Sequence, residues 1–206
     1  MKPIDAATPP PTLITGVILA GGLGRRMGGV DKGLRALHGR AMVATVIDRF
    51  APQVAELLIN ANQNAATYAA FGYRVVADVI GGYAGPLAGL HAALTAATHP
   101  LLATTPCDSP FLPLDVVSRL YTAMQAESAQ LAVAKTGDHA HPVFCLCERS
   151  LLPHLSEFLT AGGRKIDRWY ASLKIVEVGF DDVAEAFSNI NSLQELAAFE
   201  QTPPAR

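Results

Sequence analysis

The chain has 206 residues, half of them hydrophobic and only 17% charged, which is enough apolar material for the core of one domain. With 16 Lys and Arg against 18 Asp and Glu, the formal charge of −2 gives no global attraction to nucleic acid or to an anionic membrane. The composition also excludes an intrinsically disordered chain, a collagen and a disulfide scaffold.

Four apolar runs of strand length alternate with segments of helical period along the first 126 residues. The predicted strands are 15–20, 56–60, 73–77 and 101–105. The helices predicted to follow them are 42–50, 63–71, 85–97 and 113–126. Such alternation predicts parallel strands joined by right-handed crossovers, with helices on both faces of the sheet.

The pattern changes after residue 126. Residues 131–135 and 142–147 flank Thr136-Gly137-Asp138 and predict a hairpin, which would insert an antiparallel strand. The remaining predicted elements are helices at 150–159, 165–171 and 192–200 and a strand at 173–178. We therefore predict an α/β fold of three layers, α/β/α, with a Rossmann-like, mostly parallel sheet and an antiparallel insertion, in a single domain of residues 13–201.

The amino-terminal residues and the cysteines indicate the compartment. Residues 1–12 contain four prolines and lack the apolar stretch of a signal peptide, so we expect a disordered leader and a cytoplasmic protein. Three cysteines are an odd number for disulfide pairing. Cys145 and Cys147 would point to the same side of a strand, which favours packing in the core over metal or redox chemistry.

A basic, glycine-rich loop follows the first predicted strand. Five glycines lie between positions 21 and 29, and five of the sixteen basic residues lie between Arg25 and Arg40, with Asp31 as the single acid. Backbone N–H groups and cations together predict a phosphate site. A Walker A loop does not fit because Gly33 follows Lys32, and a dinucleotide fingerprint does not fit because Met27 replaces its third glycine.

Polar side chains also follow the other strands. In open parallel sheets ligands bind at the carboxyl ends of strands, where Asn60, Asp78 and Asp108 would lie. A carboxylate there can hold Mg²⁺ against phosphate oxygens. Structural roles stay open for the same residues: Asp108 as a helix N-cap ahead of Pro110, Asp78 as an ordinary loop acid, and Asn60 as a helix cap.

Two further features lie along the chain. A second glycine-rich turn at residues 81–89 leads into a predicted helix, and its backbone is suited to contact a base edge. His141 and Asn189-Ile190-Asn191 flank later strands, and for His141 alone a structural role is favoured.

The segment L-A-G-G-x-G-x-R-M-G-x-x-x-K at residues 19–32 resembles the signature of nucleotidyltransferases that make NDP-linked products. Further landmarks follow in chain order: L-I-N-A-N at 58–62, Asp78, G-P-L-A-G at 85–89, P-C-D-S-P at 106–110, His141-Pro142 and N-I-N at 189–191. Together these resemble the molybdenum cofactor guanylyltransferase family from about residue 14 to residue 199. The leader has no counterpart, and Ser109 stands where threonine is frequent.

The resemblance implies transfer of GMP from GTP to Mo-molybdopterin, which forms the molybdopterin guanine dinucleotide cofactor and pyrophosphate, with Mg²⁺ as cofactor. It implies a nucleotide-diphospho-sugar transferase-like fold, with a nucleotide-binding half at 13–112 and a pterin-substrate half at 113–201. GTP and Mo-molybdopterin are the implied partners, and proteins that deliver molybdopterin or act as molybdoenzyme chaperones are further candidates. We expect a monomer.

The resemblance also assigns roles to residues. Asp108 is the implied metal ligand, and Asn189 and Asn191 match the region near the pterin substrate. The implied catalytic residues are Asp108, Lys32 and Arg26. The implied nucleotide-binding residues are Leu19, Ala20, Gly21, Gly22, Lys32, Asn60, Asp78 and Asp108.

Other functions stay open at this point. One is a cytidylyltransferase for the same cofactor or a related NTP:phosphate nucleotidyltransferase, although Gly21-Gly22 and Cys107 before Asp108 favour guanine in the family pattern. Another is a nucleotide or pterin carrier that performs no chemistry. Lys32 together with Asp108 argues against a carrier, because a protein that only binds does not need a metal carboxylate.

Overall fold

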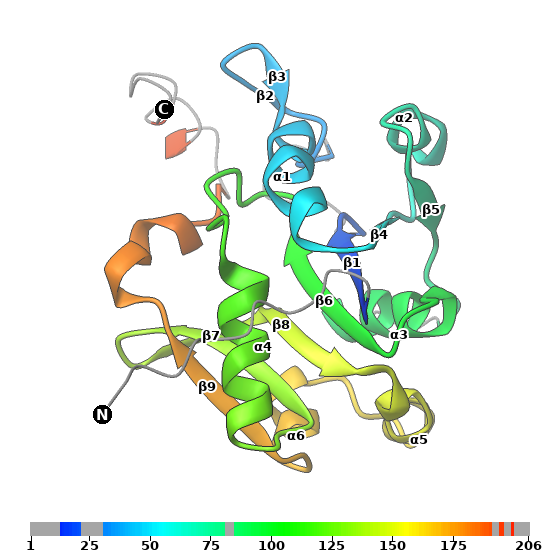
Figure 1. Ribbon diagram of the computed structural model, residues 1–206. Coiled ribbons are helices and arrows are strands. Elements are labelled where there is room, and N and C mark those ends of the chain that lie inside the picture. Colours follow the sequence, from blue (N-terminus) through cyan, green and yellow to red (C-terminus); the bar gives the residue numbers. More distant parts are fainter. Residues whose placement is uncertain (1–12, 22–30, 81–84, 191–193, 196–198, 200–206) are drawn as a thin grey trace.

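The computed structural model describes residues 13–21, 31–80, 85–190, 194–195 and 199. Within these residues seven strands form a twisted central sheet in the order β5-β4-β1-β6-β8-β7-β9, and helices cover both of its faces (Figure 1). A two-stranded hairpin, β2-β3, lies apart from this sheet. The three-layer α/β/α fold predicted from the sequence is confirmed.

The sheet is parallel apart from one strand. β4, β1 and β6 pair in parallel, as do β4 with β5 and β7 with β9. β8 is antiparallel to both of its neighbours, β6 and β7, and is therefore the predicted insertion. The strands are β1 Ile14–Leu19, β2 Ala36–Leu37, β3 Arg40–Ala41, β4 Glu56–Asn60, β5 Arg74–Val76, β6 Leu101–Pro106, β7 Leu131–Thr136, β8 His139–Glu148 and β9 Ile175–Gly179.

Two apolar clusters fill the space between the sheet and its helices. One cluster joins the sheet to α1, α4 and Tyr68 of α2, and the other joins the opposite face to α3, α5 and α6. The α-helices are α1 Met42–Phe50, α2 Ala65–Ala69, α3 Pro86–Ala96, α4 Val116–Ala126, α5 Leu152–Thr160 and α6 Ile166–Tyr170. Short 3-10 helices are η3 Ala51–Gln53, η4 Arg149–Leu151 and η5 Asp181–Phe187.

The predicted elements match the observed ones closely where the local sequence pattern determines the secondary structure. The predicted helix 42–50 and strand 56–60 coincide with α1 and β4. Cys145 and Cys147 are both buried against the same cluster, as predicted. No described helix is long and apolar enough to cross a membrane.

Tertiary contacts determine other element boundaries, which therefore differ from the predicted ones. The helix predicted from residue 113 begins instead at Val116, because Gln53 reaches over from η3 to this end of the chain. Its side-chain oxygen accepts the Val117 N–H at 3.0 Å, and its amide donates to the Pro113 carbonyl at 2.9 Å. The hairpin β2-β3 and η5 were not predicted. The predicted helix 192–200 lies largely outside the described residues.

Candidate functional site

The carboxyl ends of three neighbouring strands bring the predicted segments together. Leu19 of β1 is in register with Asn60 of β4 on one side and with Pro106 of β6 on the other. The backbone continues this contact beyond the strands, since Ala20 N–H donates to the Asn60 carbonyl at 2.8 Å and Cys107 N–H donates to the Leu19 carbonyl at 3.1 Å. The segment 19–21 therefore lies between Asn60 and the turn that carries Asp108.

Asn60 and Asp78 meet at one side of this edge. Asn60 is buried, and its side-chain amide donates to Asp78 Oδ1 at 2.9 Å and to the Val76 carbonyl at 3.2 Å. The sequence prediction brought these two residues together correctly. The role of a helix cap is wrong for Asn60, because α2 has Asn64 at its N-cap position.

Asn62 completes the surroundings of Asp78. Its side-chain amide donates to Asp78 Oδ2 at 2.8 Å and to the Gly21 carbonyl at 3.4 Å, and its side-chain oxygen accepts the Asp78 N–H at 2.9 Å. Both carboxylate oxygens of Asp78 are thus held by asparagine amides. Sequence reasoning missed Asn62, because it lies in a bend after the end of β4, where strand alternation no longer indicates the direction of a side chain.

Helix α3 packs unusually close to Asn60. Gly89 faces the Asn60 side chain, and a Cβ built on Gly89 would collide with Asn60 Oδ1 and lie 2.9 Å from a Leu19 methyl carbon. The glycine at this position of G-P-L-A-G is therefore explained by close approach of a helix to the site.

Lys32 and Asp108 meet on the other side of the edge. Lys32 Nζ lies 3.2 Å from Asp108 Oδ2, and the two side chains are 24% and 10% exposed. Asp108 does not cap a helix ahead of Pro110, since the next helix, α4, begins at Val116. The structural alternative for Asp108 is therefore wrong.

The carboxyl-terminal segment reaches the same turn. The Ile190 N–H donates to the Asp108 carbonyl at 3.0 Å, and the buried Ser109 hydroxyl donates to Asn189 Oδ1 at 2.6 Å. Asn189 is thus next to the Asp108 turn, as its assignment to the site requires. Gly22, Arg26 and Asn191 lie outside the described residues, as do positions 81–84 of the second glycine-rich turn.

Comparison with known proteins agrees with this arrangement. Residues 16–176 match the model of the MobA-like NTP transferase domain. The molybdenum cofactor guanylyltransferases of Cupriavidus taiwanensis and Cupriavidus necator are each 52% identical to this chain over 192 residues, which is 91% of this chain and 96% of the relative. This chain belongs to the molybdenum cofactor guanylyltransferase family.

A solved structure supports the fold independently. Molybdopterin-guanine dinucleotide biosynthesis protein A from Archaeoglobus fulgidus superposes with a TM-score of 0.76 at 23% identity, over 91% of this chain and 97% of that one. At that identity the likeness concerns the fold alone.

Asp78 and Asp108 are carboxylates at this edge of the sheet, and both oxygens of Asp78 already accept from asparagine amides. Among the described residues, no group of three or more His, Cys, Asp and Glu side chains gathers as a ready metal site. Mg²⁺ commonly binds through one or two carboxylates and completes its shell with water and substrate phosphates. Asp108, partly exposed and next to Lys32, fits that mode of binding.

Two other polar residues near the site have structural surroundings. His141 Nε2 lies 2.7 Å from the Thr136 hydroxyl, and its ring stacks on Phe187 at 5.0 Å. Burial, with a contribution from neighbouring His139, lowers the pKa of His141, which agrees with the structural role favoured from the sequence. Burial raises the pKa of the Cys107 thiol, so this residue of P-C-D-S-P stays protonated at neutral pH.

Proposed function

We propose that this protein transfers GMP from GTP to Mo-molybdopterin and releases pyrophosphate, so that molybdopterin guanine dinucleotide is formed. The observation that carries the proposal is the meeting of two pairs, Asn60 with Asp78 and Lys32 with Asp108, on either side of the segment 19–21. Membership of the guanylyltransferase family supports the choice of reaction.

The nucleoside would lie along one side of this edge. Backbone groups of Leu19, Ala20 and Gly21, with Gly22 beyond them, would contact the guanine nucleotide, while Asn60 and Asp78 bind the nucleoside. Because Asp78 is already held through both oxygens, it needs no rearrangement when the ligand arrives. Such preorganised positioning is the main catalytic contribution that a nucleotidyl transfer requires.

The phosphates would lie toward Lys32 and Asp108. An oxygen of the terminal phosphate of molybdopterin attacks the α-phosphorus of GTP, and the bond from that phosphorus to the bridging oxygen of pyrophosphate breaks. Lys32 and Arg26 offset the charge that develops on the leaving pyrophosphate. A phosphate monoester has a second pKa of about 6, so the nucleophile is ionised at neutral pH and no general base is needed.

Mg²⁺ is the metal that we propose for this site. Asp108 would hold it, and the ion would supply neutralisation of phosphate charge during transfer. The ammonium of Lys32 then orients Asp108 in the absence of substrate, since its Nζ lies 3.2 Å from Oδ2.

The pterin substrate would approach from the carboxyl-terminal half. We assign residues 13–112 to nucleotide binding and residues 113–201 to the pterin substrate, with Asn189 and Asn191 near the pterin. Contact between Asn189 and Ser109 supports this assignment, since it brings the second half next to Asp108. We further propose a cytoplasmic monomer that receives its substrate from a molybdopterin-delivering protein and passes its product to a molybdoenzyme chaperone.

Pyrophosphate release tests the proposal. The purified protein is incubated with Mo-molybdopterin, Mg²⁺ and either GTP or CTP, and pyrophosphate is measured over time. We expect release with GTP and little with CTP. Faster release with CTP would instead indicate a cytidylyltransferase. Binding of GTP without pyrophosphate release would indicate a carrier.

A further inference from the structure

Asp31 is the single acid of the basic loop, and three donors surround its carboxylate. The Tyr68 hydroxyl donates to Oδ1 at 2.5 Å, the Gly33 N–H donates to Oδ1 at 3.2 Å, and the Asn64 amide donates to Oδ2 at 3.1 Å. These donors come from the loop itself and from the region of α2. Asp31 therefore connects the loop to a separate element of the fold.

Helix α2 carries the tyrosine that makes this connection. All five of its residues are described, and Tyr68 is the one that is buried, with no exposed surface. Asn64 precedes the helix in a left-handed conformation, with φ of 53° and ψ of 30°. The helix thus places one large side chain in the core, and the hydroxyl of that side chain reaches Asp31.

Gly33 shows how closely Tyr68 approaches the loop. A Cβ built on Gly33 would lie 2.6 Å from Tyr68 Oη and 3.1 Å from both Cβ and Sγ of Cys107. The Gly33 carbonyl also accepts the Val43 N–H of α1 at 2.9 Å. Glycine at position 33 is needed for this close approach, which holds the backbone directly after Lys32.

Lys32 lies between Asp31 and Gly33, the two residues that contact Tyr68. Its backbone joins Asp31 to Gly33, while its ammonium reaches Asp108 at 3.2 Å. We propose that Tyr68 is a positioning residue for the reaction, which holds Asp31 and Gly33 so that the ammonium of Lys32 is directed at the phosphates beside Asp108. This inference rests on the proposed function and extends it to a residue that lies outside the nucleotide-binding motifs.

The phenol hydroxyl of Tyr68 is suited to act as a hydrogen-bond donor because it stays protonated. Burial raises the pKa of its phenol, and the neighbouring thiol of Cys107 and carboxylate of Asp31 raise it further. The hydroxyl therefore stays protonated at neutral pH. A hydrogen bond to a charged carboxylate is also among the stronger ones available inside a protein.

A double-mutant cycle tests the inference. Tyr68→Phe removes the hydroxyl and keeps the ring, and we expect kcat/KM for GTP to fall about tenfold, which corresponds to one hydrogen bond to a charged group. In the Lys32→Ala background the same change should have little further effect, because the residue that it positions is absent. Equal losses in both backgrounds would overturn the inference.

Hydrogen exchange gives a second readout that needs no turnover. We expect Tyr68→Phe to increase amide exchange in residues 31–37, and unchanged exchange there would overturn the inference. Tyr73→Phe, a change of the same kind in a residue packed against the same cluster, should leave both readouts unchanged. If the wild type releases no pyrophosphate, the proposed function fails, while exchange in residues 31–37 still tests Tyr68.

Discussion

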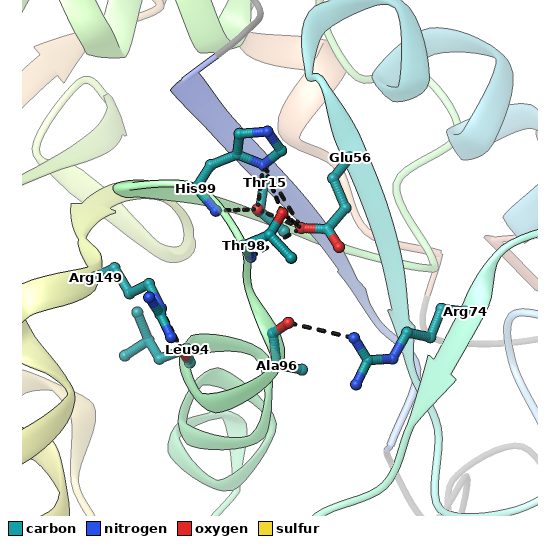
Figure 2. A network of polar contacts seen from close by, with 8 residues as sticks. All are labelled: Thr15, Glu56, Arg74, Leu94, Ala96, Thr98, His99 and Arg149. Carbon is teal, nitrogen blue, oxygen red and sulfur yellow. Dashed lines mark hydrogen bonds and ion pairs between the residues drawn. The ribbon is translucent and has the colours of Figure 1, made fainter.

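The two ends of β1, β4 and β6 carry polar networks of different kinds. At the amino-terminal end, the Glu56 carboxylate accepts the hydroxyls of Thr15 at 2.7 Å and Thr98 at 2.8 Å and the Thr98 N–H at 3.1 Å. His99 Nδ1 lies 3.6 Å from the same carboxylate (Figure 2). At the carboxyl end, Asp78 and Asp108 accept from asparagines and a lysine beside a glycine-rich loop.

The donors and acceptors of the network around Glu56 can be assigned. Both threonine hydroxyl hydrogens point to Glu56, so the contacts of His99 Nδ1 with Thr15 at 3.0 Å and with Thr98 at 3.1 Å require a hydrogen on that nitrogen. Nearby, Arg74 and Arg149 donate to the Ala96 and Leu94 carbonyls in the last turn of α3 (Figure 2). Unlike the carboxyl end, this end lies away from the turn that carries Asp108 and from the loop after Leu19, so we assign it to stabilisation of the fold.

The position of a surface depression does not indicate which of the two ends is the functional site. A depression of about 550 Å³ bordered by Pro100, Leu101 and Arg149 lies at the start of β6, on the side of Glu56 rather than of Asp108. The chemical character of the groups therefore locates the candidate site better than this depression does.

Asp108→Ala should give the largest loss. We expect guanylyl transfer to fall about a thousandfold, because the variant lacks the carboxylate that would hold Mg²⁺ and that forms an ion pair with Lys32. Pyrophosphate release with saturating Mg²⁺ and GTP measures the effect, and circular dichroism confirms the fold. Rates like those of the wild type would remove Asp108 from the mechanism.

Lys32→Ala should lower kcat/KM for GTP about a hundredfold, since one cation opposite the leaving phosphates is lost. Lys135→Ala is a suitable control, because Lys135 forms a surface ion pair with Glu177 far along the chain. An unchanged kcat/KM in Lys32→Ala would place this lysine outside the site.

Asn62→Ala should lower kcat/KM for GTP about tenfold, mainly through KM, because Asp78 loses one of its two asparagine donors. Steady-state kinetics at varied GTP concentrations separate KM from kcat. The adjacent exposed residue provides the control, as Gln63→Ala should behave like the wild type. A loss confined to kcat would show that Asn62 does not act through nucleotide binding.

Glu56→Gln should leave kcat unchanged and lower the free energy of unfolding by about 1.5–3 kcal/mol, the range for hydrogen bonds to a charged group. Burial opposes ionisation of Glu56, but hydrogen bonds from Thr15 and Thr98 and the nearby His99 lower its pKa.

The lowered pKa of Glu56 also predicts a pH dependence. Because the folded pKa lies below the unfolded value of about 4.3, the stabilisation is fully present above that value and is lost as pH falls through the folded pKa. Glu56→Gln should remove this part of the acid dependence in chemical unfolding series. Identical acid dependence in the variant and the wild type would contradict the assignment.

The parts of the site that the sequence could predict are those set by position along a strand. Asn60, Asp78 and Asp108 each follow an apolar run, and parallel pairing brings the ends of those runs together. The network around Asp31 could not be predicted in this way. It depends on Tyr68, whose spacing in an alanine-rich helix indicates only a core residue, and on the close approach of Gly33.

The element boundaries that were predicted wrongly depend either on contacts between residues far apart in the chain or on segments too short to show a pattern. Val116 rather than Pro113 begins α4 because Gln53, sixty-four positions away, supplies the acceptor for the Val117 N–H. Hairpin β2-β3 consists of two residues on each side, too short to give an apolar alternation.

The hydrogen bond from Ile190 to the Asp108 carbonyl has a consequence for synthesis of the chain. On the ribosome, the strands that carry Leu19, Asn60 and Asp108 emerge early, yet the Asp108 turn acquires this support only when residue 190 has left the exit tunnel. Ser109 and Asn189 close a loop of 80 positions in the same step. A nascent chain therefore completes its sheet, whose last strand ends at Gly179, before it completes the turn proposed to hold the metal ion. Ribosome-bound chains stalled so that residue 179 but not residue 189 has left the tunnel should fold without acquiring activity.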